Sequence, residues 1–174
     1  MIKIASIWGA LSGLCYILLT WFTTAEREAL AQFPISGLIT RVLYIVVLGF
    51  CIFFAMRATR NKLYAQTGIN YAQTLYVGVA TSLVTGFVFG IFSFLYIVFV
   101  NPNLVAELVK ETEIMMLKFN KTPKEIAETI QHVKASFEPK TQFLSSLFGT
   151  TTMGIIASAI IAVFVRNKDT FSSQ

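Results

Sequence analysis

Four long apolar stretches take up more than half of the chain and decide what it can fold into. They are Ile4–Phe22, Ile35–Met56, Leu75–Val100 and Gln142–Val165, and none of them contains an Asp or a Glu. An α-helix rises about 1.5 Å per residue, so roughly 20 apolar residues cross the ~30 Å hydrocarbon core of a bilayer. The sequence therefore predicts an all-α integral membrane protein in which four spanning helices form a bundle.

The composition agrees with a membrane protein and leaves room for one domain. Of the 174 residues, 55% are hydrophobic and 13% are charged, and the mean hydropathy is +0.68. Soluble domains carry about 25% charged residues. The first apolar stretch has 19 residues, more than the roughly 7–15 apolar residues of a signal peptide. We therefore expect a single membrane domain over residues 1–174 that keeps its first stretch as a span.

The net charge of +5 gathers at the ends of the predicted spans. With four spans, one side of the membrane receives the basic residues Lys3, Arg57, Arg60, Lys62, Arg166 and Lys168 against a single acid, Asp169. The other side receives residues 26–28 and the connection 101–141, which holds six Lys and six Glu. Lys and Arg favour the cytoplasmic side, so both termini are expected in the cytoplasm. A charge spread in this way does not predict a nucleic-acid partner.

Arg41 is the one charged residue within the four stretches, six residues after Ile35. In one interpretation its long aliphatic stem lies in the apolar region while its guanidinium reaches the headgroups. In the other it is a binding site, since a charge within a span is a functional hypothesis by default. The partner would be a lipid phosphate, a carboxylate such as Glu107 or Glu138, or another subunit.

Small residues recur every four positions in two of the stretches. In the third they are Gly78, Ser82, Gly86 and Gly90, and in the fourth they are Thr150, Gly154, Ser158 and Ala162. Gly9 and Gly13 repeat the spacing in the first. Residues four apart share a helix face, and small side chains let membrane helices approach closely. We expect these faces to hold the bundle together; the alternative is that one of them forms a subunit interface.

The connection between the third and fourth spans has the pattern of a helical hairpin, over about residues 102–138. Asn101, Pro102 and Asn103 are expected to end the third span and cap a new helix. Its apolar face would carry Leu104, Val105, Leu108, Val109, Thr112, Met115, Met116 and Phe119. Thr122, Pro123 and Glu125 then form a capping-box pattern. The second helix would present Ile126, Ile130, Val133 and Phe137.

The two apolar faces of this extramembrane hairpin need a cover. They could pack on each other, lie in the membrane interface, cover the outer mouth of the bundle or dock a partner. The mixed charge of the hairpin argues against adsorption by charge alone.

The sequence lacks the usual signs of catalysis. His132 is the only histidine, and a metal site needs several converging ligands. No span carries a carboxylate for proton relay or cation coordination. Cys15 and Cys51 lie within spans without a Cys-x-x-Cys motif, as buried apolar residues do. We therefore expect no enzyme activity, no cofactor and no metal.

One stretch resembles a known family. Residues 53–62, Phe-Phe-Ala-Met-Arg-Ala-Thr-Arg-Asn-Lys, are similar to the G-I-K-x-Y-R-D-K end of the second span in an uncharacterised bacterial inner-membrane family of the domain-of-unknown-function type. Met56 and Arg57 stand where that family has Ile-Lys, and Asn61 stands for its Asp. The entry to the third span (68–78) and the charged hairpin before the last span are also similar. The resemblance implies four spans in a bacterial inner membrane and supplies no activity.

These observations favour a non-enzymatic membrane protein. It would be an accessory or scaffold subunit, or a small homo-oligomer, whose partners are the lipid bilayer and another membrane subunit or a second copy. The alternative is a permeation protein for a small solute or an anion attracted by Arg41. A membrane enzyme acting on lipid is the least supported hypothesis, because no acid–base pair is visible.

Overall fold

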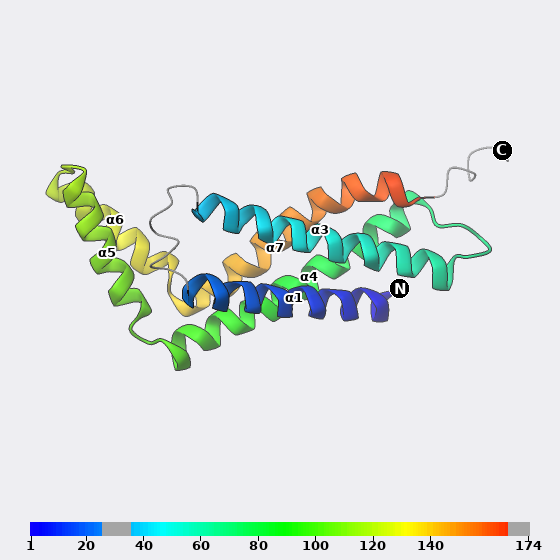
Figure 1. Ribbon diagram of the computed structural model, residues 1–174, viewed down its shortest axis with the longest axis horizontal. Coiled ribbons are helices and arrows are strands. Elements are labelled where there is room, and N and C mark those ends of the chain that lie inside the picture. The colour runs from blue at the N-terminus through cyan, green and yellow to red at the C-terminus, as the bar shows by residue number, and fades with distance from the viewer. Residues whose placement is uncertain (26–35, 167–174) are drawn as a thin grey trace. The chain divides into compact units, whose positions relative to one another are not determined.

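The computed structural model describes residues 1–25 and 36–166, and these residues form helices and no strand. Four helices are long and apolar: α1 (Ile2–Ala25), α3 (Ser36–Leu63), α4 (Tyr71–Leu95) and α7 (Pro139–Val165). Two are shorter and amphipathic: α5 (Leu104–Lys118) and α6 (Pro123–Ser136). A π-helical turn, Tyr96–Val100, extends α4. Figure 1 labels these α-helices. The all-α fold, with four helices able to cross a membrane and a hairpin before the last of them, is confirmed.

The helices are longer than the apolar stretches that predicted them. Helix α3 continues past Met56 to Leu63, so the basic residues that follow Met56 lie on its last turns. This position is favourable because the carbonyl end of a helix attracts cations. Helix α4 begins at Tyr71, before Leu75, and α7 begins at Pro139, where proline suits the first turn. Ile35, the predicted start of the second span, lies outside the described residues.

The chain forms two compact units. The first, called the bundle here, comprises Met1–Phe89 and the chain from Leu147 onward, and so contains α1, α3, most of α4 and most of α7. The second, called the hairpin unit, is Gly90–Ser146 and contains α5 and α6. The expectation of one domain stays a prediction.

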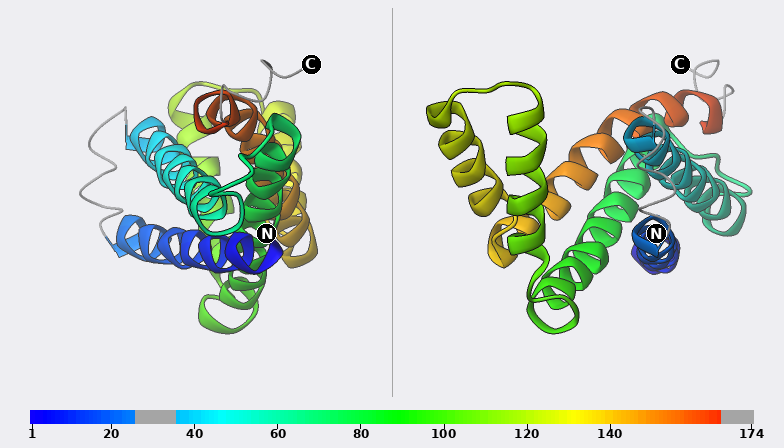
Figure 2. Two further views of the ribbon diagram at one scale, coloured as in Figure 1. Left: turned by 90° about the vertical axis from the view of Figure 1, so that its right-hand side faces the viewer. Right: turned by 60° about the vertical axis from the view of Figure 1, so that its left-hand side comes forward.

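Within the bundle, aromatic pairs join α1 to α3 in antiparallel order. Trp8 stacks on Phe54 with ring centroids 5.5 Å apart. About two turns further along α1, the Tyr16 hydroxyl donates a 2.8 Å hydrogen bond to the carbonyl of Tyr44. The numbering rises on α1 as it falls on α3, so the two helices run in opposite directions, as Figure 2 also shows.

Helix α4 contacts each of the other three helices of the bundle. A Cβ added at Gly9 of α1 would lie 2.7 Å from the carbonyl oxygen of Thr81. A Cβ added at Gly78 would overlap Ser158 of α7 and lie 2.5 Å from the Met56 methyl of α3. The order of these contacts makes the four helices alternate in direction along the chain. The bundle is therefore an up-and-down arrangement around α4.

The interior of the bundle combines apolar and hydroxylated side chains, and its surface is apolar. Leu48, Ile52, Met56 and Val77 are buried. Among the described residues, seven hydroxyl side chains are buried as well: Ser12, Thr59, Thr74, Thr81, Ser82, Thr85 and Ser158. Large side chains such as Leu18, Phe87 and Phe164 are exposed instead. In each of the four candidate spans, only 22–28% of the residues in the most apolar 18-residue segment are buried inside the protein. This distribution suits a bilayer, where lipid chains cover the large apolar side chains and small residues allow helices to meet.

Hydroxyl groups tie the small interior to the backbone. The Thr85 hydroxyl lies 2.9 Å from the Thr81 carbonyl of its own helix and 3.2 Å from the Gly9 carbonyl of α1. Back-bonding of this kind satisfies the hydroxyl where no water is available. The Ser12, Thr59 and Ser158 hydroxyls are buried without a hydrogen-bond partner among the described residues.

One end of the bundle collects positive charge. The alternating directions bring together Lys3, the end of α3 with Arg57, Arg60 and Lys62, and Arg166 after α7. Two contacts fix this end: the Arg60 guanidinium donates to the Val165 carbonyl at 3.1 Å, and the Tyr64 hydroxyl lies 3.0 Å from the Met1 sulfur. Gly68, with φ of 72°, makes the following turn in the left-handed region that glycine tolerates.

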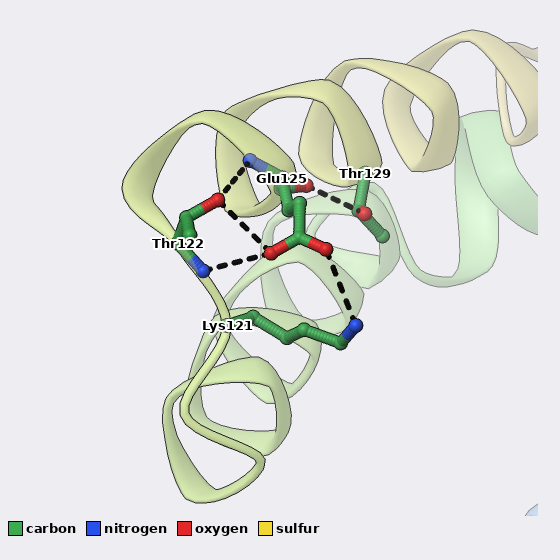
Figure 3. A network of polar contacts seen from close by, with 4 residues as sticks. All are labelled: Lys121, Thr122, Glu125 and Thr129. Atoms are coloured by element: carbon green, nitrogen blue, oxygen red, sulfur yellow. Dashed lines mark hydrogen bonds and ion pairs between the residues drawn. The ribbon is translucent and has the colours of Figure 1, made fainter.

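In the hairpin unit, α5 and α6 pack side by side in antiparallel order (Figure 2). The predicted capping box is confirmed. The Glu125 N–H donates to the Thr122 hydroxyl at 3.3 Å, and the Thr122 N–H donates to the Glu125 carboxylate at 2.9 Å (Figure 3). Asn103 is the N-cap residue of α5, as predicted, but its side chain makes no capping bond, and its αR backbone lets the turn after Pro102 run straight into the helix.

Replacing Gly154 with Leu should lower the thermal unfolding midpoint of the protein purified in mild detergent. A Cβ at Gly154 would overlap the Ser82 side chain of α4, and overpacking costs about 1–3 kcal/mol. Gly49→Leu is the matched control, because a Cβ at Gly49 meets no atom within 4 Å. Equal midpoints for the two variants would contradict this account of α4–α7 packing.

Replacing Thr122 with Ala should speed amide hydrogen exchange in the first turn of α6, because losing an N-cap costs about 1 kcal/mol. The N–H and hydroxyl of Thr122, and then Lys121, hold the pKa of the Glu125 carboxylate below its usual range. Because that folded-state pKa is lowered, the stabilisation is full above the ordinary Glu range of about pH 4.3 and is lost as the pH falls below it. Protection in this turn should therefore fall in acid, and the Thr122→Ala variant should show a smaller acid effect. An acid effect of the same size in both proteins would count against the capping box.

Candidate functional site

The candidate site is a pocket of about 300 Å³ in the bundle, open on one side. Helices α1, α3, α4 and α7 all contribute to it, and it is lined by Tyr16, Arg41, Tyr44, Ile45, Phe89, Gly149, Thr150 and Met153. Its walls are almost wholly apolar. At neutral pH, Arg41 is the only charged residue of that lining.

Three aromatic rings form one side of the pocket. Tyr16 meets Tyr44 and Phe89 edge to face, with centroids 4.7 Å and 5.4 Å apart. The Tyr44 hydroxyl lies 2.7 Å from the Thr20 hydroxyl. The hydroxyls of Tyr16 and Tyr44 are thus engaged within the protein, so these rings hold α1, α3 and α4 at fixed positions around the pocket.

Arg41 lies on the second turn of α3, and its side chain is exposed. It is two residues inside Ile39–Leu63, the part of α3 apolar enough to span, which places it about 3 Å along the helix from Ile39. Within the described part of the bundle there is no Asp or Glu that could form an ion pair with its guanidinium. Glu107 and Glu138, the carboxylates that the sequence offered as partners, lie in the other unit.

The small residues singled out in the sequence fall at helix contacts. Gly78 and Ser82 of α4 face Ser158 and Gly154 of α7. A Cβ on Gly13 of α1 would lie 2.7 Å from the Val88 side chain of α4. Gly86 is buried, and in the hairpin unit a Cβ on Gly90 would lie 3.0 Å from the Phe143 ring. A role of these residues in packing or assembly stays a prediction.

A second candidate surface lies at the turn of the hairpin. Four large apolar residues at the end of α5, called the hairpin tip here, are exposed by 46–69%: Ile114, Met115, Leu117 and Phe119. Met115 and Phe119 belong to the apolar face predicted for this helix, and the hairpin itself does not cover them. Residues 120–125 are Asn, Lys, Thr, Pro, Lys and Glu, so the start of α6 offers the end of α5 no large apolar side chain.

The remaining candidate groups do not converge. The His132 ring lies 3.1 Å from the Ser136 hydroxyl on the same helix. Cys15 is partly buried and Cys51 is buried, and both are free thiols. In the described part of the chain, no group of three or more His, Cys, Asp or Glu side chains could hold a metal ion.

Sequence reasoning found Arg41 but missed the residues around it. Tyr44 and Ile45 follow Arg41 by three and four positions, so they share its helix face, and this signal was available. Tyr16, Phe89 and Thr150 come from other helices, and no pattern in the sequence links them to Arg41.

The comparisons with known proteins identify the family and no activity. No curated protein matches the chain, and no solved structure matches it. One family model, described as "Protein of unknown function (DUF4199)", matches residues 3–167. That match covers all four apolar helices and the hairpin between the last two. The chain therefore belongs to the DUF4199 family of proteins of unknown function.

Proposed function

We propose that this membrane protein is a non-catalytic assembly protein, an accessory or scaffold subunit or a small homo-oligomer, that makes its contact through the hairpin tip. The observation that carries the proposal is the exposure of four large apolar side chains on a helix outside the predicted spans. Phe119 is 69% exposed and Leu117 is 58% exposed. Contiguous apolar surface of this kind is typical of interaction sites.

A protein partner explains the hairpin tip better than a membrane surface does. The exposed apolar residues surround the end of α5 instead of forming one face, so a flat interface would cover only part of them. The neighbouring charges are mixed, with Glu113 beside the tip and Lys121 already paired to Glu125 at 3.2 Å. A partner with an apolar groove would cover all sides of the tip.

Permeation has less support. A solute pathway needs polar groups or water along its wall, and the pocket beside Arg41 is almost wholly apolar. The interior of the bundle is closed by contacts such as Gly154 against Ser82. A measured flux that Arg41→Ala abolished, with assembly intact, would favour permeation and contradict the assembly proposal.

The assembly experiment is purification in mild detergent followed by mass measurement of the intact complex. We expect a stoichiometric complex, with a second protein or with further copies of the chain. Leu117→Gln with Phe119→Gln should dissociate it, since apolar anchors dominate binding. The control pair Ala106→Gln with Ala135→Gln changes exposed positions elsewhere on the hairpin. A monomer before any substitution, or a complex that survives both pairs equally, would rule the proposal out.

The orientation follows from the charged end of the bundle. With Lys and Arg favouring the cytoplasm, the bundle end with Arg57, Arg60 and Lys62 would face the cytoplasm, together with both termini, in a bacterial inner membrane. The hairpin would then lie outside.

Cysteine labelling tests this orientation. Lys121→Cys should react with a membrane-impermeant maleimide in intact cells, and Lys62→Cys should react only after the membrane is opened. The unsubstituted chain, with Cys15 and Cys51 inside helices, supplies the background. The reverse pattern of labelling would invert the topology.

A further inference from the structure

We infer that the pocket around Arg41 binds an anionic phospholipid, with the phosphate on the guanidinium and the start of an acyl chain against the aromatic wall. This site is separate from the hairpin tip and does not depend on the assembly function.

The described part of the bundle offers Arg41 no counterion. It contains no Asp or Glu, and the other residues of the lining are neutral at pH 7. Arg41 lies on the second turn of α3, and the first turn carries no acidic residue that could pair with it. An external anion can therefore serve as the counterion of this guanidinium.

The depth of the pocket matches the layout of a lipid. Arg41 is about 3 Å inside the apolar part of α3, close to the headgroup level. Tyr44 and Ile45 follow one turn deeper, and the remaining lining is apolar. The positive charge of Arg41 at the headgroup level complements the lipid phosphate. The apolar lining below it complements the acyl chain.

The size and charge of the pocket restrict which lipids can bind. A volume of about 300 Å³, open on one side, is at the lower end for small-molecule sites, so it holds one end of a lipid while the rest stays in the bilayer. Guanidinium groups bind phosphate oxygens in bidentate geometry. A lipid with net negative charge is favoured over a zwitterionic lipid, because the pocket offers no anion to a choline or ethanolamine group.

Two substitutions distinguish the contribution of the Arg41 charge to lipid binding from the contribution of the cavity. Arg41→Gln removes the charge and keeps a long side chain. Gly149→Phe fills the pocket, since Gly149 lines it and a Cβ there meets no atom within 4 Å. Gly49→Phe is the matched control, because Gly49 is equally open and is not part of the lining.

The experiment titrates the purified protein with phosphatidylglycerol, phosphatidylcholine of the same chains, or inorganic phosphate, and counts bound ligands by native mass spectrometry. We expect roughly tenfold tighter binding of phosphatidylglycerol than of phosphatidylcholine, because both lipids offer a phosphate to Arg41 but the choline cation of the second would lie near the guanidinium. Arg41→Gln should abolish this preference. Gly149→Phe should weaken both lipids at least fivefold, and Gly49→Phe should bind as the unsubstituted protein does. Thermal midpoints confirm that each variant is folded.

Three results would overturn the inference. The first is a preference for phosphatidylglycerol that survives Arg41→Gln. The second is unchanged lipid binding by Gly149→Phe. The third is inorganic phosphate competing with phosphatidylglycerol at equal concentration, which would make Arg41 a site for free anions.

Discussion

The close approach of α4 to α1 and α7 is the constraint on which the rest of the bundle depends. Helices in a bilayer gain no hydrophobic free energy by meeting, because lipid chains are as apolar as leucine. What favours contact is van der Waals packing and hydrogen bonding at short range, and both need small side chains. Gly9 against Thr81 and Gly154 against Ser82 allow this approach. The Thr85 hydroxyl then reaches the Gly9 carbonyl at 3.2 Å, a contact that a wider helix spacing would break.

This packing explains why the large apolar side chains face outward. Glycine, serine and threonine bring α4 close to its neighbours, and Leu48, Ile52 and Met56 fill what interior is left, so Leu18, Phe87 and Phe164 face outward. In water such a surface would drive aggregation, and in a bilayer it is the solvated face. The same logic does not cover the hairpin tip. Phe119 and Leu117 lie outside the candidate spans, so their exposure calls for another kind of partner.

The features that could be predicted from the sequence are those with a local cause. Apolar stretches of 19 residues or more predicted the four long helices, and Thr122 with Glu125 predicted a cap that forms as expected. Helix ends were less predictable, because α3 runs on past the apolar region to Leu63 through a segment in which Arg, Ala, Lys and Leu, all good helix formers, outnumber Thr59 and Asn61. The cover of the hairpin could not be predicted. Helical spacing placed Met115 on the apolar face of the first hairpin helix, but whether a neighbouring side chain covers it depends on the start of α6.

The two interpretations of Arg41 describe the same geometry. A long stem that passes through the apolar layer brings the guanidinium to the headgroups, and the phosphates are there. Snorkelling by itself needs no pocket and fits any lipid, since it only returns the charge to a polar layer. The structure adds an apolar hollow bounded by Tyr16, Phe89 and Met153, directly beside the charge. A helix that only had to place a cation at the interface would gain nothing from aromatic rings held edge to face at 4.7 Å and 5.4 Å around a pocket. The cavity turns a general preference for headgroups into the capacity to hold one lipid.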